Sequence, residues 1–241
     1  MKRTGRGIAG FLLFLVLWAA AARLADTPLL PSPLSLLSRD GRGLLLHLCV
    51  SLGRIGAGLG LALIVGVPLG ILSAERPGAG RLIDNLTWFL YPVPSVLFLP
   101  VLLVLFGPGD LSKILLVFLS LVFLVIVSAR DQVRVLPGEY FKTLQSLGAG
   151  PLRILLDLYL PSLGPGLFST LRVGLSIAGA VLFFAENFGS TGGIGWFIMD
   201  SRVRVDYLSL YQGILALGLS LFLLLGVLFL LERLLCPWSG Q

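Results

Sequence analysis

Polar and ionisable side chains that recur at helical spacing inside long apolar stretches are the residues of this sequence that could do chemistry. The largest set follows alternating steps of three and four residues, which places its members on one face of a helix. Ionisable groups inside an apolar helix are costly, so they usually pair with one another or line a path for a solute. The set consists of Ser169, Arg172, Ser176, Gly179, Phe183 and Glu186.

Arg172 and Glu186 stand fourteen positions apart, roughly 21 Å along a helix, so they cannot pair within it. One is therefore expected near each membrane surface. Two interpretations stay open. In the first, Arg172 extends toward lipid headgroups and Glu186 caps a helix or pairs with a neighbouring one. In the second, both residues contact a transported solute.

A second polar stripe consists of His47, Ser51, Arg54 and Gly58, at steps of four, three and four, and an apolar half follows it. One interpretation is an amphipathic entry segment that lies near the outer membrane interface. The other is a lining for a translocation path, in which Arg54 would meet the solute. The residue types are compatible with both.

Enzymatic constellations are missing from the sequence. No Gly-Lys pair is present, so there is no phosphate-binding P-loop; the two Gly-Leu-Ser triplets lack the second glycine of a nucleophile elbow; and no His-Glu-x-x-His motif occurs. The single histidine, His47, and the two cysteines, Cys49 and Cys236, cannot assemble a metal site. We therefore expect a protein that is not an enzyme and holds no metal or cofactor, so that any ATP it depends on binds to another chain.

The elements that must position these side chains are membrane helices. Of the 241 residues, 56% are hydrophobic and 12% charged, and the mean hydropathy of +0.98 exceeds what a soluble protein tolerates. About 20 apolar residues cross the hydrocarbon layer as a helix. Six such runs predict an all-α integral membrane protein with six transmembrane helices, at 8–24, 55–73, 85–106, 112–129, 166–185 and 208–231.

The first run has two interpretations, because Lys2, Arg3 and Arg6 ahead of an apolar stretch are also typical of a secretory signal that is later removed. We expect the run to be retained as a helix. The five other runs keep the chain in the membrane in either case.

The distribution of lysine and arginine predicts the orientation. With the N-terminus inside, ten of these residues fall in cytoplasmic segments, namely the leader, the 75–84 loop, residues 130–165 and the C-terminus, and six fall outside. Both termini are therefore expected to be cytoplasmic. The net charge of +6 is scattered over the loops without forming a stripe, which favours contact with lipid headgroups and argues against binding of nucleic acid.

Three prolines, Pro92, Pro94 and Pro100, interrupt the third run. Each removes a helical hydrogen bond, and a freed carbonyl at membrane depth is tolerated only against protein or water. We expect a kinked helix that faces the bundle interior. A plain packing kink and a gating element both stay open as its role.

Residues 134–165 interrupt the apolar pattern with glycine, proline and charge. A helix over 134–148 should end at Gly148, and a second short helix that starts at Pro151 should end at Pro161. Two such helices with an apolar face make a cytoplasmic knob that fits a partner's groove. Two charged residues four positions apart would lie on the exposed side of the second helix, namely Arg153 and Asp157.

In this stretch the sequence resembles the cytoplasmic signature of the inner-membrane permease subunits of binding-protein-dependent ABC importers, of the nitrate, sulfonate, taurine and bicarbonate type. That signature runs Glu-Ala-Ala, then a glycine, then an apolar residue shortly before Leu-Pro. Gly148-Ala149 and Leu160-Pro161 stand in the matching places. The sequence departs from the signature at its front, where Lys142, Thr143 and Leu144 replace Glu-Ala-Ala and Glu139 stands three residues early.

The resemblance extends over nearly the whole chain, and the order and spacing of the matching segments make it specific. The segments are "LLPSP" at 29–33, "GVPLGIL" at 66–72, "YPVPSVLFLPVLLVLFGPGDLSKILL" at 91–116, "AENFGSTGGIGWFI" at 185–198 and "YQGILALGLSLFLLLGVLFLLERLL" at 211–235.

This resemblance implies a type I ABC importer permease with a cytoplasmic coupling-helix loop, placed in a bacterial inner membrane. It divides the chain into an N-terminal helix with an outer segment (1–43), a permease core (44–235) that contains the loop 134–165, and a tail (236–241). The partners it implies are a second copy of the chain, a dimer of ATPase subunits that bind ATP and Mg²⁺, and an extracytoplasmic substrate-binding protein.

Roles for individual residues follow from the same resemblance. The residues that would couple to the ATPase are Glu139, Lys142, Leu144, Gly148, Ala149, Arg153, Leu160 and Pro161. Those that would line the translocation path are Arg54, Pro92, Pro94, Ser95, Arg172, Ser176, Phe183 and Glu186. Gly192, Gly193 and Gly195 would form a flexible external gate loop.

The solute that the resemblance implies is a small anion such as nitrate, a sulfonate, taurine or bicarbonate, which Arg54 and Arg172 would suit. A neutral or heterocyclic organic solute, such as a vitamin precursor, is the alternative. A secondary transporter would need internal repeats or a coupling carboxylate at mid-membrane, for which Glu186 is the only candidate. A membrane enzyme would need a nucleophile with a base, which the sequence lacks.

Overall fold

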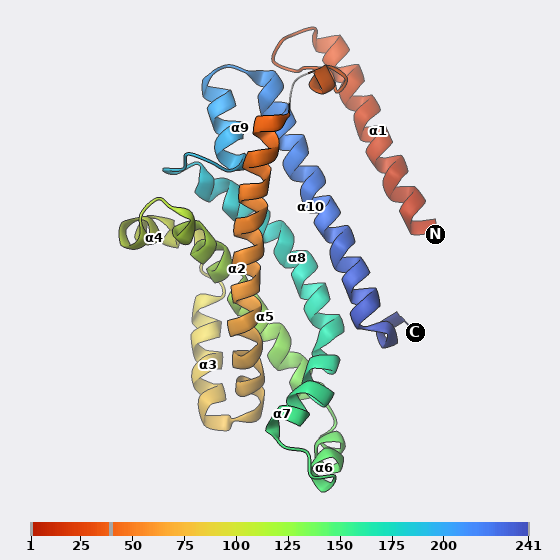
Figure 1. Cartoon of the computed structure of the whole chain (residues 1–241), viewed down its shortest axis with the longest axis vertical. Helices are drawn as coiled ribbons and strands as arrows, with labels where there is room; N and C mark the ends of the chain where they lie inside the picture. Colours follow the sequence, from red (N-terminus) through yellow and green to blue (C-terminus); the bar gives the residue numbers. More distant parts are fainter. Residues whose placement is uncertain (1, 39–40, 241) are drawn as a thin grey trace.

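All regular secondary structure in this computed structural model, which describes residues 2–38 and 41–240, is helical. Figure 1 shows an elongated bundle in which α2, α8 and α10 run along the long axis. The α-helices are α1 (Lys2–Ala25), α2 (Arg42–Glu75), α3 (Pro77–Leu90), α4 (Leu99–Phe106), α5 (Asp110–Val135), α6 (Gly138–Ser146), α7 (Pro151–Ile154), α8 (Leu160–Glu186), α9 (Ile194–Val203) and α10 (Tyr207–Leu235). The shorter turns are η1 (Ser35–Ser38), η2 (Ser95–Phe98), the π turn η3 (Leu155–Tyr159) and η4 (Pro237–Gly240).

Four helices among the described residues are long and apolar enough to cross a membrane, namely α2, α5, α10 and the continuous segment Pro151–Glu186 that joins α7 to α8. The pair formed by α3 and Ser95–Phe106 is apolar enough to add a fifth span if the two bent helices are counted as one. Five of the six predicted runs fall on these elements. The first run falls on α1, whose described apolar part, Leu15–Ala25, is shorter than a span, so the count of six stays a prediction.

The seam between α2 and α5 forms the core of the bundle, and glycines of α2 let the two helices approach closely. A Cβ added at Gly58 would lie 2.6 Å from the side chain of Val117, and one at Gly66 would lie 2.8 Å from that of Val125. Both valines are buried. Lipid tails are as apolar as the side chains, so close packing of small residues is what holds such a seam together in a membrane.

The two ends of the bundle carry different elements. In Figure 1, α6 and α7 lie at one end, and α9 lies with the beginning of α2 at the other. The first helix stands apart beside α10, which it meets through Trp18 against Tyr211, with ring centroids 5.6 Å apart. The N-terminus of α1 and the C-terminus of α10 both point toward the α6 end, so they lie on one side of the bundle.

The first correction to the sequence-based expectation concerns α2. The predicted run began at residue 55, with a separate amphipathic segment before it as one interpretation. Instead, α2 is one helix of 34 residues, Arg42–Glu75. The polar residues of its first half bond to α8 and to the first residue of α9, so this half is part of the helix bundle and not a separate segment.

The second correction concerns the third run, which was expected to be one kinked helix. It is two helices that meet at an angle of 90°. Pro92 and Pro94 have no N–H, so the carbonyls of Trp88 and Leu90 lose their helical donors, and two such losses in succession end α3 at Leu90. Pro100 lies in the first turn of α4, where no helical hydrogen bond is lost.

The third correction concerns the short helix that was expected to end at Pro161. The chain instead passes from α7 through a π turn straight into α8. Pro161 cannot donate a hydrogen bond, and the residue before it donates to the carbonyl of Leu155, five residues back. The wider turn therefore absorbs the proline without breaking the helix.

Replacing Gly66 by valine should separate α2 from α5, because the new side chain meets the buried Val125. We expect a loss of about 1–3 kcal/mol in the free energy of unfolding, seen as a lower midpoint of thermal unfolding in detergent. Gly60→Val is the matched control, because a Cβ at Gly60 of the same helix meets nothing within 4 Å. Equal midpoints for the two variants would contradict the close-packed seam.

Candidate functional site

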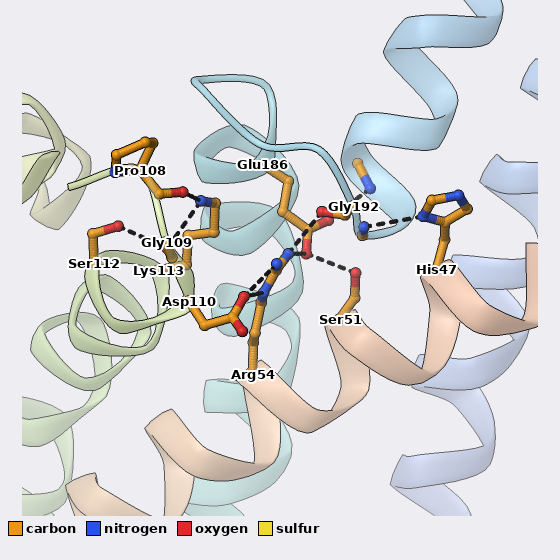
Figure 2. A network of polar contacts seen from close by, with 12 residues as sticks. His47, Ser51, Arg54, Pro108, Gly109, Asp110, Ser112, Lys113, Glu186 and Gly192 are labelled. Atoms are coloured by element: carbon orange, nitrogen blue, oxygen red, sulfur yellow. Dashed lines mark hydrogen bonds and ion pairs between the residues drawn. The ribbon is translucent and has the colours of Figure 1, made fainter.

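A buried carboxylate at the end of α8 organises a polar network at the α9 end of the bundle (Figure 2). Glu186 is fully buried. Its Oε1 accepts hydrogen bonds from Ser51 Oγ and from Arg54 Nη1 of α2, both at 2.7 Å. Its Oε2 accepts the backbone N–H of Gly195, also at 2.7 Å. One carboxylate thus ties α8 to α2 and to α9.

The guanidinium of Arg54 is the cation of this network, and it is 8% exposed. Besides Glu186, it donates from Nε (2.8 Å) and Nη2 (2.5 Å) to Oδ1 of Asp110, the first residue of α5. It also donates from Nη1 to the carbonyl of Gly192 at 2.9 Å. Arg54 therefore joins α2, α5, α8 and the loop before α9, and its side chain is paired with carboxylates of its own chain.

The loop that leads into α9 is attached to α2 by its backbone. The N–H of Gly193 donates to Nδ1 of His47 at 3.2 Å, and the N–H of Ile194 donates to Oγ of Ser51 at 2.7 Å. The Nδ1 atom of His47 accepts this bond and therefore carries no proton in this geometry. The proposed gate glycines are thus held by several hydrogen bonds in this structure.

Only glycine fits at position 193. Its φ of +112° lies in the left-handed region. An added Cβ would also lie 2.3 Å from the carboxyl group of Glu186 and 2.6 Å from Nη1 of Arg54. The loop therefore reaches the carboxylate so closely that no side chain has room.

A second buried cation, Lys113, lies at the same end of the bundle. It is fully buried, and its ammonium donates to the carbonyls of Pro108 and, at 3.0 Å, of Gly109. Together with Arg54 it balances the two carboxylates of Asp110 and Glu186. Asp110 and Lys113 were not among the residues predicted from the sequence, although two charges three residues apart at the start of an apolar run are a visible signal.

These contacts settle part of what the sequence left open. Glu186 pairs with a neighbouring helix, as one of its two interpretations expected. At the other end of α8, Arg172 forms an ion pair with Glu232 of α10 and lies over the ring of Phe229, 4.6 Å from its centroid. Both arginines that favoured an anionic solute are therefore bound to carboxylates of the chain. Glu186, the candidate for secondary transport, is likewise occupied.

Three of the predicted path residues, Pro92, Pro94 and Ser95, come together in a cavity of about 290 Å³ at the break between α3 and η2. Its walls also include Ser120 of α5 and Ile177 of α8. Figure 1 places this break about midway along the bundle. The remaining predicted path residues lie elsewhere: Ser176 is exposed on α8, Phe183 is partly buried, and Arg54, Arg172 and Glu186 belong to the ion pairs.

The predicted coupling residues lie together at the α6 end. Helix α6 ends where Gly148 adopts a φ of +76°, as expected of a helix-stop glycine. The N–H of Gly148 donates to Gln145, and that of Ala149 donates to Leu144, both at 3.0 Å. The other members of the set are placed as follows: Glu139, Lys142, Arg153 and Leu160 are exposed, and Pro161 is partly buried in the first turn of α8.

Residues 66–239 match the family model described as binding-protein-dependent transport system inner membrane component. The chain belongs to this family. The permease is 32% identical to the taurine transport system permease protein TauC of Escherichia coli over 195 residues, which are 81% of this chain and 71% of that protein. It is 28% identical to the bicarbonate transport system permease protein CmpB of Synechococcus elongatus over 211 residues, 80% of this chain and 76% of that one.

Two further matches, one to a curated protein and one to a solved structure, extend over a larger share of the matched protein. The formylaminopyrimidine transport permease protein ThiX of Halalkalibacterium halodurans is 26% identical over 236 residues, 96% of the permease and 94% of ThiX. A chain of the MetNI methionine ABC transporter, solved in inward-facing conformations, matches with a TM-score of 0.66 and 17% identity over 83% of the permease and 96% of that chain. The permease therefore has the type I importer fold and is a translocation subunit of a binding-protein-dependent importer.

Removing the carboxylate of the permease network should cost much stability, because it leaves the buried Arg54 with only the exposed Asp110 as a counter-charge. For Glu186→Ala we expect a loss of about 3–5 kcal/mol in the free energy of unfolding, measured as a lower unfolding midpoint in detergent. Asp157→Ala is the control, since the Arg153–Asp157 pair lies at the surface and should change little. A similar small effect for both variants would show that Glu186 does not organise this end.

Substituting Gly193 by alanine should detach the loop from α2, because of its positive φ and its contact with Glu186. We expect faster hydrogen exchange at the amides of Ile194 and Gly195. Gly192→Ala is the matched control, because a Cβ there would make only an ordinary contact with His47 at 3.9 Å. Unchanged exchange in Gly193→Ala would contradict the tight loop.

Proposed function

We propose that two copies of this permease form the membrane path of an ATP-driven importer. A separate ATPase subunit would dock on the α6–α7 end of each copy and bind the ATP and Mg²⁺. A substrate-binding protein would deliver a small solute to the α9 end. The curated relatives are named for taurine, bicarbonate and formylaminopyrimidine transport, so a zwitterion, an anion and a heterocycle occur among their solutes.

The observation that carries the proposal is the form of the α6–α7 end. Large apolar side chains are exposed there: Leu147 is 76% exposed and Leu152 is 68% exposed. Such side chains favour burial in a partner's groove. Helix α7, which carries Leu152, continues without a break into α8, so a displacement of the docked α7 would move a membrane helix as a rigid body.

The charge distribution supports placing this end in the cytoplasm of a bacterium, together with both termini. The positive-inside rule counts lysine and arginine near the ends of membrane helices. Several such residues lie on the loops and helix ends around α6, namely Arg76, Arg81, Arg134, Lys142, Arg153 and Arg233.

The first experiment is to tag the chain, extract it gently from its native membrane and identify stoichiometric partners by mass. We expect an ATPase with a P-loop at about one copy per copy of the permease. Leu147→Asp should abolish that recovery by placing a charge in the docking face. Repeated recovery of the permease without an ATPase would refute the proposal.

Gly148→Val should abolish ATP-driven uptake while leaving the chain inserted in the membrane, because valine does not tolerate the φ of +76° that turns α6 toward α7. Uptake into reconstituted vesicles measures the effect. Gly150→Val is the matched control two residues away, where φ is −76° and a Cβ meets nothing within 4 Å. Uptake that survives in Gly148→Val would contradict the role of the loop.

A further inference from the structure

The cavity at the break between α3 and η2 has a lining that is poor in hydrogen-bond donors. Proline supplies a carbonyl but no N–H, and two of the residues at its rim are Pro92 and Pro94. The backbone N–H groups of Tyr91 and Val93 are already bonded to the carbonyls of Thr87 and Leu90. Apart from the N–H of Ser95, the backbone at the break therefore offers the cavity mainly acceptors, of which the carbonyl of Pro94 already accepts from the N–H of Leu97.

Three hydroxyl groups line the cavity, and two of them, those of Ser95 and Ser120, have used their protons. Ser120 Oγ donates to the carbonyl of Leu116 at 2.7 Å. Its separation from Ser95 Oγ is 2.7 Å, and since Ser120 has only one proton, Ser95 must be the donor of that bond. The hydroxyl of Ser95 can therefore accept a hydrogen bond from a solute but cannot donate one. The hydroxyl of Tyr91 can act as either donor or acceptor.

Charge is absent from the described residues that line this cavity, and its remaining walls are apolar, with Phe98 and Phe123 among them. The arginines that could meet an anion are held in ion pairs with Glu186, Asp110 and Glu232, outside the lining. An oxyanion such as nitrate accepts hydrogen bonds but donates none, so it would exchange its hydration shell for few donors here, mainly the Tyr91 hydroxyl and the N–H of Ser95.

We propose that this cavity is a solute-selecting site of the translocation path, and that it takes a small uncharged solute with an apolar ring and N–H or O–H donors. The donors would bond to the Ser95 oxygen and the carbonyls of the break, and the ring would lie against the aromatic wall. A volume of about 290 Å³ lies at the lower end of the range for small-molecule sites. The inference rests on the proposed importer function and narrows its solute class.

The test uses the complete importer, with its ATPase and binding protein, in proteoliposomes. Uptake is measured for three radiolabelled probes: nitrate, methanesulfonate and an uncharged aminopyrimidine. Stimulation of ATP hydrolysis by the binding protein is measured separately, because its absence would refute the importer function whatever the cavity does. With that stimulation present, we expect uptake of the aminopyrimidine and of neither anion.

Variants connect the uptake to the cavity. Ser95→Ala should lower aminopyrimidine uptake by about threefold to tenfold, the effect of one lost hydrogen bond, while the stimulated ATPase rate is unchanged. Ser95→Thr retains the hydroxyl and should restore uptake. Ser220→Ala is the matched control, because Ser220 is a buried membrane serine that bonds only within α10, to Leu217. Uptake of either anion, or undiminished uptake in Ser95→Ala, would overturn the proposal.

Discussion

The absence of water in the hydrocarbon layer is the constraint on which this structure depends, because every buried polar group must find its partner within the protein. Glu186 shows the consequence most directly. Its carboxylate accepts from Ser51, Arg54 and the backbone of Gly195. These donors come from different elements, so satisfying one buried charge fixes the relative positions of α2, α8 and α9. The α9 end of the permease is thus held by electrostatics as much as by packing.

The same constraint explains the proline-containing segments. Two prolines separated by one residue cannot be accommodated within a membrane helix, so the chain breaks at Leu90 and the freed backbone faces a protein-lined cavity. A single proline at position 161 is accommodated by a π turn, because one wider hydrogen bond is enough to continue the helix. The spacing of the prolines therefore distinguishes the broken span from the continuous one, which contains Pro165 as well as Pro161.

The continuous helical span links the two ends of the molecule. Pro151–Glu186 is a continuous span of 36 residues, roughly 54 Å at the rise of an α-helix. One end of it follows the exposed α6 and the other ends in the buried network. Between them, the ion pair of Arg172 with Glu232 ties the span to α10. A motion imposed at α6 would thus act on a long helical span whose other end is held in the polar network around Glu186.

The membrane class, five of the helical runs, the helix stop at Gly148 and the family could all be predicted from the residue pattern, because hydropathy, glycine and proline act locally and leave a direct mark on that pattern. The pattern also placed Ser51, Arg54 and Glu186 on polar faces. Their partners depend on folding, since Arg54 and Glu186 are 132 residues apart and no local period reports which faces will meet. The tertiary structure also decided that Ser95 lies against Ser120 of α5, and that Lys113 is buried, because both depend on how separate helices pack.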